Sequence, residues 1–321
     1  MKARDCNISL NYASAKSIVL GFTLELNLTR IQNATSQKYG SRMQTPLVEI
    51  LMATYNGEPF LGAQIESILA QSYKNWHLVI HDDGSSDGTV RLVHDFASRF
   101  PSQITLINDG MAHGSAKRNF AHLMGHVTAD YVMLADQDDI WLPNKVQHSM
   151  DRVMAEEKRL DKCTPVAVFT DLVVVDEELE VIAPSFWAFQ NLRPQRLVAS
   201  VENLAVRNCI TGCTLLMNRS AFSVCLPVPE VAVMHDWWCG LKILQAKGKL
   251  IPLHSASILY RQHSGNVVGA RQWGVGVIFR KISGFRRYRQ EFWANYMMAK
   301  HFLPDINIVS FFLRKIMLAI R

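Results

Sequence analysis

The residues with the clearest chemical meaning are three carboxylates within four positions, Asp136, Asp138 and Asp139, interrupted only by Gln137. They directly follow the apolar run 131–135, so a buried strand is expected to end in this acidic turn. Clustered carboxylates next to a core need a counter-charge or strong hydrogen-bond donors. A divalent cation holding a phosphate supplies that counter-charge, and oxygen ligands favour Mg²⁺ or Mn²⁺. The alternative is a solvated turn that begins a helix.

Two more predicted strands end in polar side chains. Thr54, Tyr55 and Asn56 follow the apolar run 47–53, and the Asp- and Ser-rich run 82–89 follows the strand expected at its amino end. Carboxyl ends of parallel strands meet at one edge of a sheet, so these groups can face one ligand. The sequence contains neither G-x-G-x-x-G after a strand nor a G-x-x-x-x-G-K-[ST] loop. A bound diphosphate would therefore need a metal and side chains for its neutralisation.

The elements that position these groups alternate between strand and helix from residue 46 onward. Short apolar runs predict strands, and apolar residues at helical spacing predict the helices between them. Such repeats imply an α/β fold with a mostly parallel sheet and helices on both faces. The expected strands are 47–53, 76–81, 104–107, 131–135, 166–170 and 205–217. The expected helices include one with Pro59 in its first turn and an apolar stripe at Leu61, Ile65, Ile68 and Leu69, one capped by Ser86 or Asp87, and 115–127. The last two strands are expected to make the sheet mixed.

Composition and charge narrow the class of protein. The 321 residues are 49% apolar and 19% charged, as in a globular protein, and the six cysteines form no C-x-x-C pair. Residues 271–321 hold ten Lys and Arg against two acidic residues, whereas the remainder is nearly neutral. A basic tail on a neutral body suits an anionic membrane surface better than nucleic acid, so no nucleic-acid partner is expected. Its aromatic residues could alternatively pack on the preceding domain as a helical cap.

The chain is expected to divide into three parts. Residues 1–44 are a weakly structured N-terminal extension or upstream sequence, 45–270 form the catalytic domain, and 271–321 form a basic helical C-terminal tail. Neither a signal peptide nor a membrane-spanning segment is predicted. The expected location is the cytoplasm, either free or at the inner face of the cell membrane.

Several of these motifs, in this order, resemble those of family 2 glycosyltransferases. The resemblance covers residues 46–270 and includes Thr54-Tyr55-Asn56, the run 82–89 and the acidic turn. The segments 135–141, 234–238 and 260–263 are similar to the bacterial rhamnosyltransferase-like branch. The resemblance implies a single glycosyltransferase A-type domain with a Rossmann-like sheet.

The resemblance also implies which residues bind the donor, a nucleoside diphosphate sugar. Tyr55 would offer a stacking face to the base, and Asp138, with Asp136, would hold Mn²⁺ or Mg²⁺. The loop that begins at 261 would close over the diphosphate. The residues assigned to the nucleotide sugar are Thr54, Tyr55, Asn56, Asp82, Asp83, Asp136, Arg261 and His263.

On the acceptor side, Asp236 matches the family's catalytic base, which takes the proton of the attacking hydroxyl. His235 would either orient this carboxylate or cap a helix. Thr211 and Gly212 resemble the segment that lines the acceptor pocket, although a strand bulge explains the glycine equally well. Trp237 and Trp238 could stack on sugars, and core packing is the alternative for both.

These assignments predict an inverting, metal-dependent transfer of a sugar to a hydroxyl of a glycan or lipid-linked glycan in cell-surface polysaccharide synthesis. Rhamnose from dTDP-rhamnose is one candidate, and UDP-activated hexoses are another. A nucleotidyltransferase that makes nucleotide sugars is a rival, but it should show a glycine-rich basic loop after the first strand. A non-catalytic glycan- or nucleotide-binding member of the fold is the second rival. The oligomeric state stays open.

Overall fold

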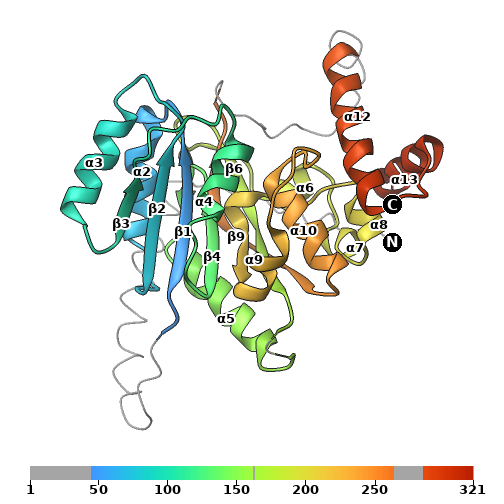
Figure 1. Ribbon diagram of the computed structural model, residues 1–321, viewed down its shortest axis with the longest axis horizontal. Coiled ribbons are helices and arrows are strands. Elements are labelled where there is room, and N and C mark those ends of the chain that lie inside the picture. The colour runs from blue at the N-terminus through green and yellow to red at the C-terminus, as the bar shows by residue number, and fades with distance from the viewer. Residues whose placement is uncertain (1–44, 162, 264–284, 321) are drawn as a thin grey trace, which may run out of the picture.

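The computed structural model describes residues 45–161, 163–263 and 285–320, and its centre is one nine-stranded sheet (Figure 1). The first half of the chain supplies four parallel strands in the order β3-β2-β1-β4. These strands are β1 (Val48–Thr54), β2 (Trp76–Asp82), β3 (Ile104–Ile107) and β4 (Tyr131–Ala135). All four lie within one residue of their predicted bounds, because each is a short apolar run bounded by polar turns.

The second half makes the sheet mixed, as the sequence predicted. β8 runs antiparallel to both β4 and β6, whereas β9 runs parallel to β6. The strands of this half are β5 (Ile140–Trp141), β6 (Val166–Val175), β7 (Val181–Ala183), β8 (Leu216–Asn218) and β9 (Lys249–Arg261). The prediction of a strand over 205–217 is therefore wrong for all but its last two residues. Most of that segment is a loop followed by the 3-10 helix η2 (Gly212–Thr214), which carries Thr211 and Gly212 to the sheet edge.

The helices that follow the parallel strands match their predictions closely. α2 (Glu58–Leu69) has Pro59 in its first turn, and Ser115 caps α4 (Ala116–Met124) by accepting a hydrogen bond from the Arg118 amide. The N-cap of α3 (Thr89–Arg99) is Gly88 rather than the predicted Ser86 or Asp87. The other helices are α5 (Lys145–Glu157), α6 (Phe186–Phe189), α7 (Pro194–Leu197), α8 (Val201–Leu204), α9 (Arg219–Cys225), α10 (His235–Gln245), α12 (Phe285–Phe302) and α13 (Ile308–Ile320).

Two hydrophobic clusters cover the two faces of the sheet. Successive residues of β1 alternate between them, with Ile50 and Met52 in one and Leu51 in the other, as the period of a strand requires. Each face is thus closed by helices, which leaves the carboxyl edge of the parallel strands open to hold a site.

The C-terminal helices pack on the domain rather than standing apart from it. Tyr296, Phe302 and Phe311 are buried in the same cluster as Trp238, and the Trp238 ring lies 5.1 Å from that of Phe302. The described part of the predicted tail is thus a helical cap. Residues 1–44 and most of the basic run at 271–287 lie outside the residues whose side chains are described, so those assignments stay predictions. Within the described ranges, no helix is long and apolar enough to cross a membrane.

Candidate active site

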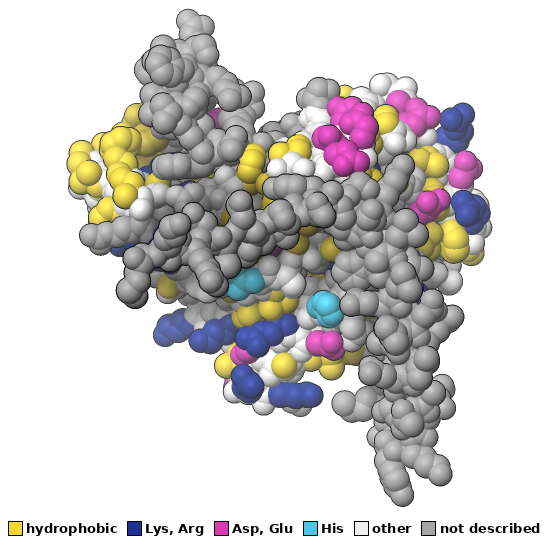
Figure 2. Space-filling view, turned by 180° about the vertical axis from the view of Figure 1, so that it is seen from behind, with side chains coloured by type: hydrophobic (Ala, Val, Ile, Leu, Met, Phe, Trp, Pro, Cys, Tyr) yellow, Lys and Arg dark blue, Asp and Glu magenta, His cyan; other side chains and the backbone are white. Residues whose placement is uncertain are grey.

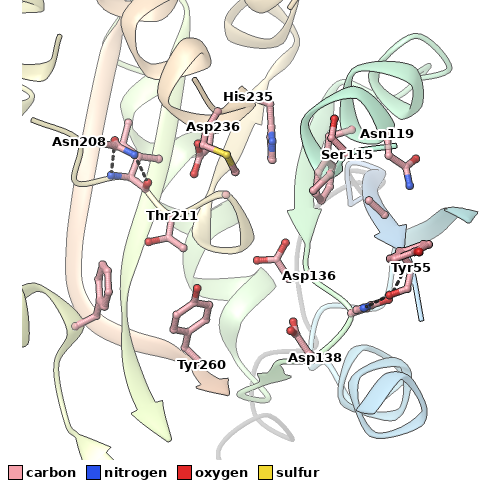
Figure 3. Close-up of a pocket in the computed structure, with 18 of the residues that line it drawn as sticks. Tyr55, Ser115, Asn119, Asp136, Asp138, Asn208, Thr211, His235, Asp236 and Tyr260 are labelled. Carbon is pink, nitrogen blue, oxygen red and sulfur yellow. Dashed lines mark hydrogen bonds between the residues drawn. The ribbon is translucent and has the colours of Figure 1, made fainter. Parts of the chain in front are cut away.

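A cavity of about 1680 Å³ lies where the first, second and fourth strands end (Figure 3). The polar segments predicted to meet there do meet: Tyr55, Asp83 and Asp136 all line it. The N-terminal turn of α10, the loop before η2 and one face of α13 close the other sides. The site therefore combines the parallel half of the sheet with elements from the far end of the chain.

The wall expected to hold the nucleobase is built from turns that hold one another. Tyr55 is 57% exposed and lines the cavity. Its amide donates to the side chain of Gln137 (2.9 Å), and the Gln137 amide group donates back to the Tyr55 carbonyl (2.9 Å). This two-point contact ties the end of β1 to the acidic turn. Gln137 was not among the predicted site residues, since a side chain that bonds to backbone leaves no motif.

The Gln137 side chain packs so closely against the backbone at Gly57 that a larger residue there would displace it. A Cβ built on Gly57 would lie 2.3 Å from Oε1 of Gln137, far inside contact distance. Asn56, whose φ is 46°, donates its amide to Ser85 and accepts from the Ser86 amide. Asn56 therefore lines the cavity but also fixes the turn, which is a structural role that the sequence did not predict.

The two neighbouring aspartates of the second strand end have different roles. Asp82 accepts hydrogen bonds from Thr54, Ser85 and the Gly84 amide, so it organises the turn and does not line the cavity. The prediction that Asp82 contacts the nucleotide is therefore corrected. Asp83 lines the cavity and accepts from the backbone amides of the loop at 113–114. Its other carboxylate oxygen has no hydrogen-bond partner among the described residues.

The acidic turn divides into cavity-lining and buried carboxylates. Asp136 and Asp138 line the cavity, whereas Asp139 is fully buried and faces the core. Burial, then the charges of Asp138 and Asp236, raises the pKa of Asp136 to about 7. Burial, then its carboxylate neighbours, also raises the pKa of Asp139 well above its usual range. Such repulsion is relieved by a cation or by a proton.

Two sets of side chains could ligate a cation here. Asp136, Asp139 and Cys213 have ligand atoms within 4.8 Å of one another. We favour Asp136 and Asp138, because these two carboxylates line the cavity and the buried Cys213 thiol has a strongly raised pKa. A protonated thiol is a poor ligand for the hard cations that carboxylates attract.

The segment at 260–263 reaches the acidic turn but only part of it faces the cavity. His263 lines the cavity and pairs with Asp138, with 2.7 Å between Nε2 and Oδ2. Arg261 instead donates to the backbone carbonyls of Asp138 and Glu177, and its guanidinium lies over the Phe60 ring at 4.9 Å. Arg261 is not among the residues that line the cavity, and it fixes the backbone of the acidic turn. Its contact with the diphosphate stays a prediction.

The predicted base lies across the cavity from the acidic turn (Figure 3). Asp236 stands in the first turn of α10. Burial raises the pKa of its carboxyl to about 6, although hydrogen bonds from backbone amides lower it. The Trp237 amide donates to this carboxyl over 2.6 Å. A Cβ on Gly212 would come within 3.6 Å of the Asp236 carboxylate and within 3.1 Å of His235. Gly212 thus lets the loop before β8 approach the base closely.

Three residues next to the base do not act as predicted. Trp237 and Trp238 are both buried and donate their indole N–H to the carbonyls of Leu204 and Cys225. Their predicted stacking on acceptor sugars is therefore corrected to core packing. His235 makes no side-chain hydrogen bond within the described residues, stacks on Phe120 at 4.2 Å, and has its pKa lowered to about 3 by burial. It packs beside the base as a neutral ring and neither orients the carboxylate nor caps the helix.

The far side of the cavity is formed mostly by residues that belong to none of the sequence motifs. Phe312, Lys315 and Ile316 come from α13, and Asn208 and Tyr260, above and below Thr211 in Figure 3, complete the wall. Arg207 anchors this helix by donating to the Leu318 carbonyl (2.7 Å). A helix that begins 72 residues after the base (308 − 236) could not have been assigned to the site from sequence.

Comparison with known proteins agrees with this geometry. Residues 49–224 match the family model described as Glycosyl transferase family 2. The chain is 36% identical over 237 residues to the dTDP-rhamnosyl transferase RfbG of Shigella flexneri, covering 68% of this chain and 74% of that protein. It is 29% identical to UDP-Glc:alpha-D-GlcNAc-diphosphoundecaprenol beta-1,3-glucosyltransferase WfgD of Escherichia coli, covering 56% of this chain and 62% of that protein.

The fold also has a solved counterpart. The mannosyltransferase PcManGT from Pyrobaculum calidifontis, in complex with GDP-Man and Mn²⁺, superposes with a TM-score of 0.51 at 16% identity, covering 95% of this chain and 90% of that one. Against some curated relatives the match spans only about a third to two thirds of their length. Because the family model covers more than half of the chain and RfbG matches most of it, this protein belongs to Glycosyl transferase family 2.

Proposed function

We propose that the protein transfers one sugar from a nucleoside diphosphate sugar to an acceptor hydroxyl, with inversion at the anomeric carbon. The observation that carries this proposal is the placement of Asp236 opposite the Asp136–Asp138 turn across one cavity (Figure 3). Inversion requires the base and the leaving group to stand on opposite faces of the sugar, as in inverting glycosidases. Family membership favours this activity over the nucleotidyltransferase rival.

Asp236 would take the proton of the attacking hydroxyl. With a pKa of about 6, its carboxylate is ionised at neutral pH and yet more basic than an ordinary aspartate. Desolvation is the main cause of that basicity, so it depends on the buried position at the start of α10. Gly212 would leave room for the acceptor beside the base, since no side chain projects from that position.

Asp136 and Asp138 would hold a divalent cation on the donor side. The residues present fit such an ion, because burial and mutual repulsion work against two ionised carboxylates unless a cation lies between them. Mg²⁺ or Mn²⁺ would neutralise charge on the departing diphosphate. His263, which pairs with Asp138, would hold that carboxylate in place.

The donor would lie along the wall that begins at Tyr55. The exposed Tyr55 ring offers a stacking face to a nucleobase. The Asp83 oxygen that makes no hydrogen bond to any described residue can accept from the base or ribose. dTDP-rhamnose is the first candidate donor, since the RfbG protein is named a dTDP-rhamnosyl transferase. UDP-glucose is the second, from the name of WfgD.

We further propose that the acceptor is linked to a lipid and arrives along α13. Phe312 and Ile316 line the cavity, while Leu313, Met317 and Ile320 on the same helix are each more than half exposed. Hydrophobic side chains gather at the end of the molecule formed by α12 and α13 (Figure 2). An exposed apolar face flanked by Arg314 and Lys315 suits an anionic bilayer surface. The acceptor named for WfgD carries such a lipid.

The roles of the carboxylates are tested with two substitutions. Asp236→Asn should abolish transfer while donor binding stays within about twofold, because the base touches the acceptor and not the diphosphate. Asp138→Asn should weaken donor binding measured with Mn²⁺. Asp95→Asn, on the exposed face of α3, is the matched control. A transfer-competent Asp236→Asn enzyme would overturn the proposal.

Membrane contact is tested separately. Leu313→Ser with Met317→Ser should reduce co-sedimentation with anionic liposomes, because both exposed side chains would enter the interface. Ile182→Ser, on the half-exposed edge of β7, is the control and should have no effect. Equal sedimentation of all three proteins would refute the role of α13 without affecting the assignment of the base.

A further inference from the structure

A second cluster of possible metal ligands lies behind the wall that holds Tyr55 and Asp83. His81 stands at the end of β2, His113 in the loop after β3, and His122 on α4. Their ring centroids are 4.6–5.3 Å apart, and one ligand atom of each lies within 4.8 Å of the others. Asp109 contacts two of them, with 3.1 Å to Nε2 of His81 and 2.7 Å to Nε2 of His122.

The protonation pattern of His81 points to a cation in this cluster. The side-chain amide of Asn119 donates to the His81 carbonyl (3.1 Å), so its oxygen accepts from Nδ1 of His81 (2.7 Å). In neutral His81 the proton therefore sits on Nδ1, and Nε2 presents a lone pair to a carboxylate oxygen. The Nε2 lone pair and the carboxylate oxygen would repel each other unless a proton or a metal ion lay between them. A hydrogen bond to the distal nitrogen is the usual support of a metal-bound imidazole.

The other two histidines also have a ring nitrogen without a hydrogen-bond donor or acceptor among the described residues. Nε2 of His113 is buried and has no hydrogen-bond partner in the described residues. Nε2 of His122 is close to Asp109 but lacks hydrogen-bond geometry. Metals bind the neutral form of imidazole, in which one ring nitrogen carries a lone pair. Protonating all three rings would instead place three positive charges around one carboxylate.

We propose that His81, His113, His122 and Asp109 form a structural zinc site, distinct from the acidic turn. Three imidazoles and one carboxylate make the four-ligand set of a closed tetrahedral site. Tetrahedral bonds of 2.0–2.1 Å put ligand atoms about 3.3 Å apart, so the three imidazole atoms, now within 4.8 Å of one another, would close in on the ion. Asp109 lies beside them, with Oδ1 3.1 Å from His81 and Oδ2 2.7 Å from His122, and would supply the fourth ligand. Imidazole ligands select zinc and similar transition metals over Mg²⁺, so the two sites would hold different ions.

The site would brace the nucleotide-binding wall. It joins β2, the loop after β3 and α4, and the loop amides of His113 and Gly114 donate to Asp83. Gly114 and Asn119 line the cavity, and Asn119 also holds His81. Zinc would thus fix the loop that presents Asp83 to the donor without itself contacting the donor.

Metal content tests the proposal directly. The full chain, with any affinity tag removed, is incubated with Zn²⁺, desalted and measured by elemental analysis. We expect one zinc ion per chain, retained in Asp138→Asn and lost in His113→Gln with His122→Gln. His94→Gln, at an exposed position on α3, is the matched control and should keep the ion.

Spectroscopy and a milder variant cover the case in which the double variant misfolds. Co²⁺ bound to the wild type should give the intense visible absorption of a tetrahedral ion, and Asp109→Asn should lose or weaken it with circular dichroism unchanged. Wild-type protein that retains only substoichiometric zinc would overturn the proposal. Equal zinc in the wild type and the double variant would also overturn it. Neither result bears on whether Asp236 is the base.

Discussion

Replacing the base Asp236 by asparagine should stabilise the protein while inactivating it. Burial raises the pKa of this carboxyl from its usual 3.8 to about 6, so the folded state binds a proton that the unfolded chain has released. Stability therefore falls as pH rises between these two values, and the full cost of the buried charge is present above pH 6. Asparagine has the same shape and can still accept the Trp237 amide, but it carries no charge.

The size of the effect follows from the pKa. One pKa unit corresponds to about 1.4 kcal/mol, so a rise of about two units costs about 3 kcal/mol at pH 8. Asp236→Asn should recover most of that free energy of unfolding at pH 8, which corresponds to about 4–6 °C in Tm. Near pH 4.5 the gain should shrink to about 1 kcal/mol, because wild-type Asp236 is then mostly protonated when folded.

Urea unfolding of the wild type and Asp236→Asn at the two pH values measures this difference, with Asp95→Asn as the control for an exposed carboxylate. Donor turnover is measured on the same preparations. An asparagine variant that is less stable than the wild type at pH 8 would refute the claim that the base is held at an electrostatic cost. A variant whose stability gain does not change with pH would refute the raised pKa.

Three further predictions concern the walls of the cavity. Gly57→Ala should weaken donor binding about tenfold. The new Cβ would displace the Gln137 side chain and break its two hydrogen bonds to the end of β1, each worth about 1 kcal/mol. Isothermal titration calorimetry measures the dissociation constant of the donor. Gly62→Ala, inside α2 with only an ordinary contact, is its control and should be neutral or stabilising. Trp237→Phe should cost about 1–3 kcal/mol in urea unfolding with acceptor KM unchanged, since the indole serves the core. His263→Ala should raise the Mn²⁺ concentration needed for half-maximal turnover, because Asp138 loses its partner.

The parallel half of the fold could be predicted from sequence because its signals are local. Each strand from β1 to β4 is a mostly apolar run, interrupted by single polar residues such as Glu49 in β1 and His77 in β2, that is followed by polar residues. Each intervening helix shows its own period. The convergence of Tyr55, Asp83 and Asp136 then follows from topology alone, since parallel strands end at one edge. The placement of Asp236 opposite them came from resemblance to a family rather than from spacing.

The second half was predicted less well because its structure depends on distant partners. The apolar segment 205–215 reads like a strand but is a loop and a 3-10 turn, whose side chains pack into the core without pairing. The tryptophans at 237–238 suit either a core or a sugar site, and the tertiary contacts of Trp237 with Leu204 and of Trp238 with Phe302 place them in the core. The contribution of α13 to the cavity and the histidine cluster at 81, 113 and 122 depend on tertiary contacts between segments far apart in sequence.

The central claim is that the cavity between Asp236 and the acidic turn binds and activates a nucleotide sugar. The most direct test measures nucleoside diphosphate release from dTDP-, UDP- and GDP-sugars, with Mn²⁺ and with EDTA, since slow donor hydrolysis requires no known acceptor. We expect release from one nucleotide class, most readily dTDP-rhamnose, that EDTA abolishes and Asp138→Asn strongly reduces. Silence on every donor, together with no thermal stabilisation by any nucleoside diphosphate, would contradict the account and favour a non-catalytic binding protein.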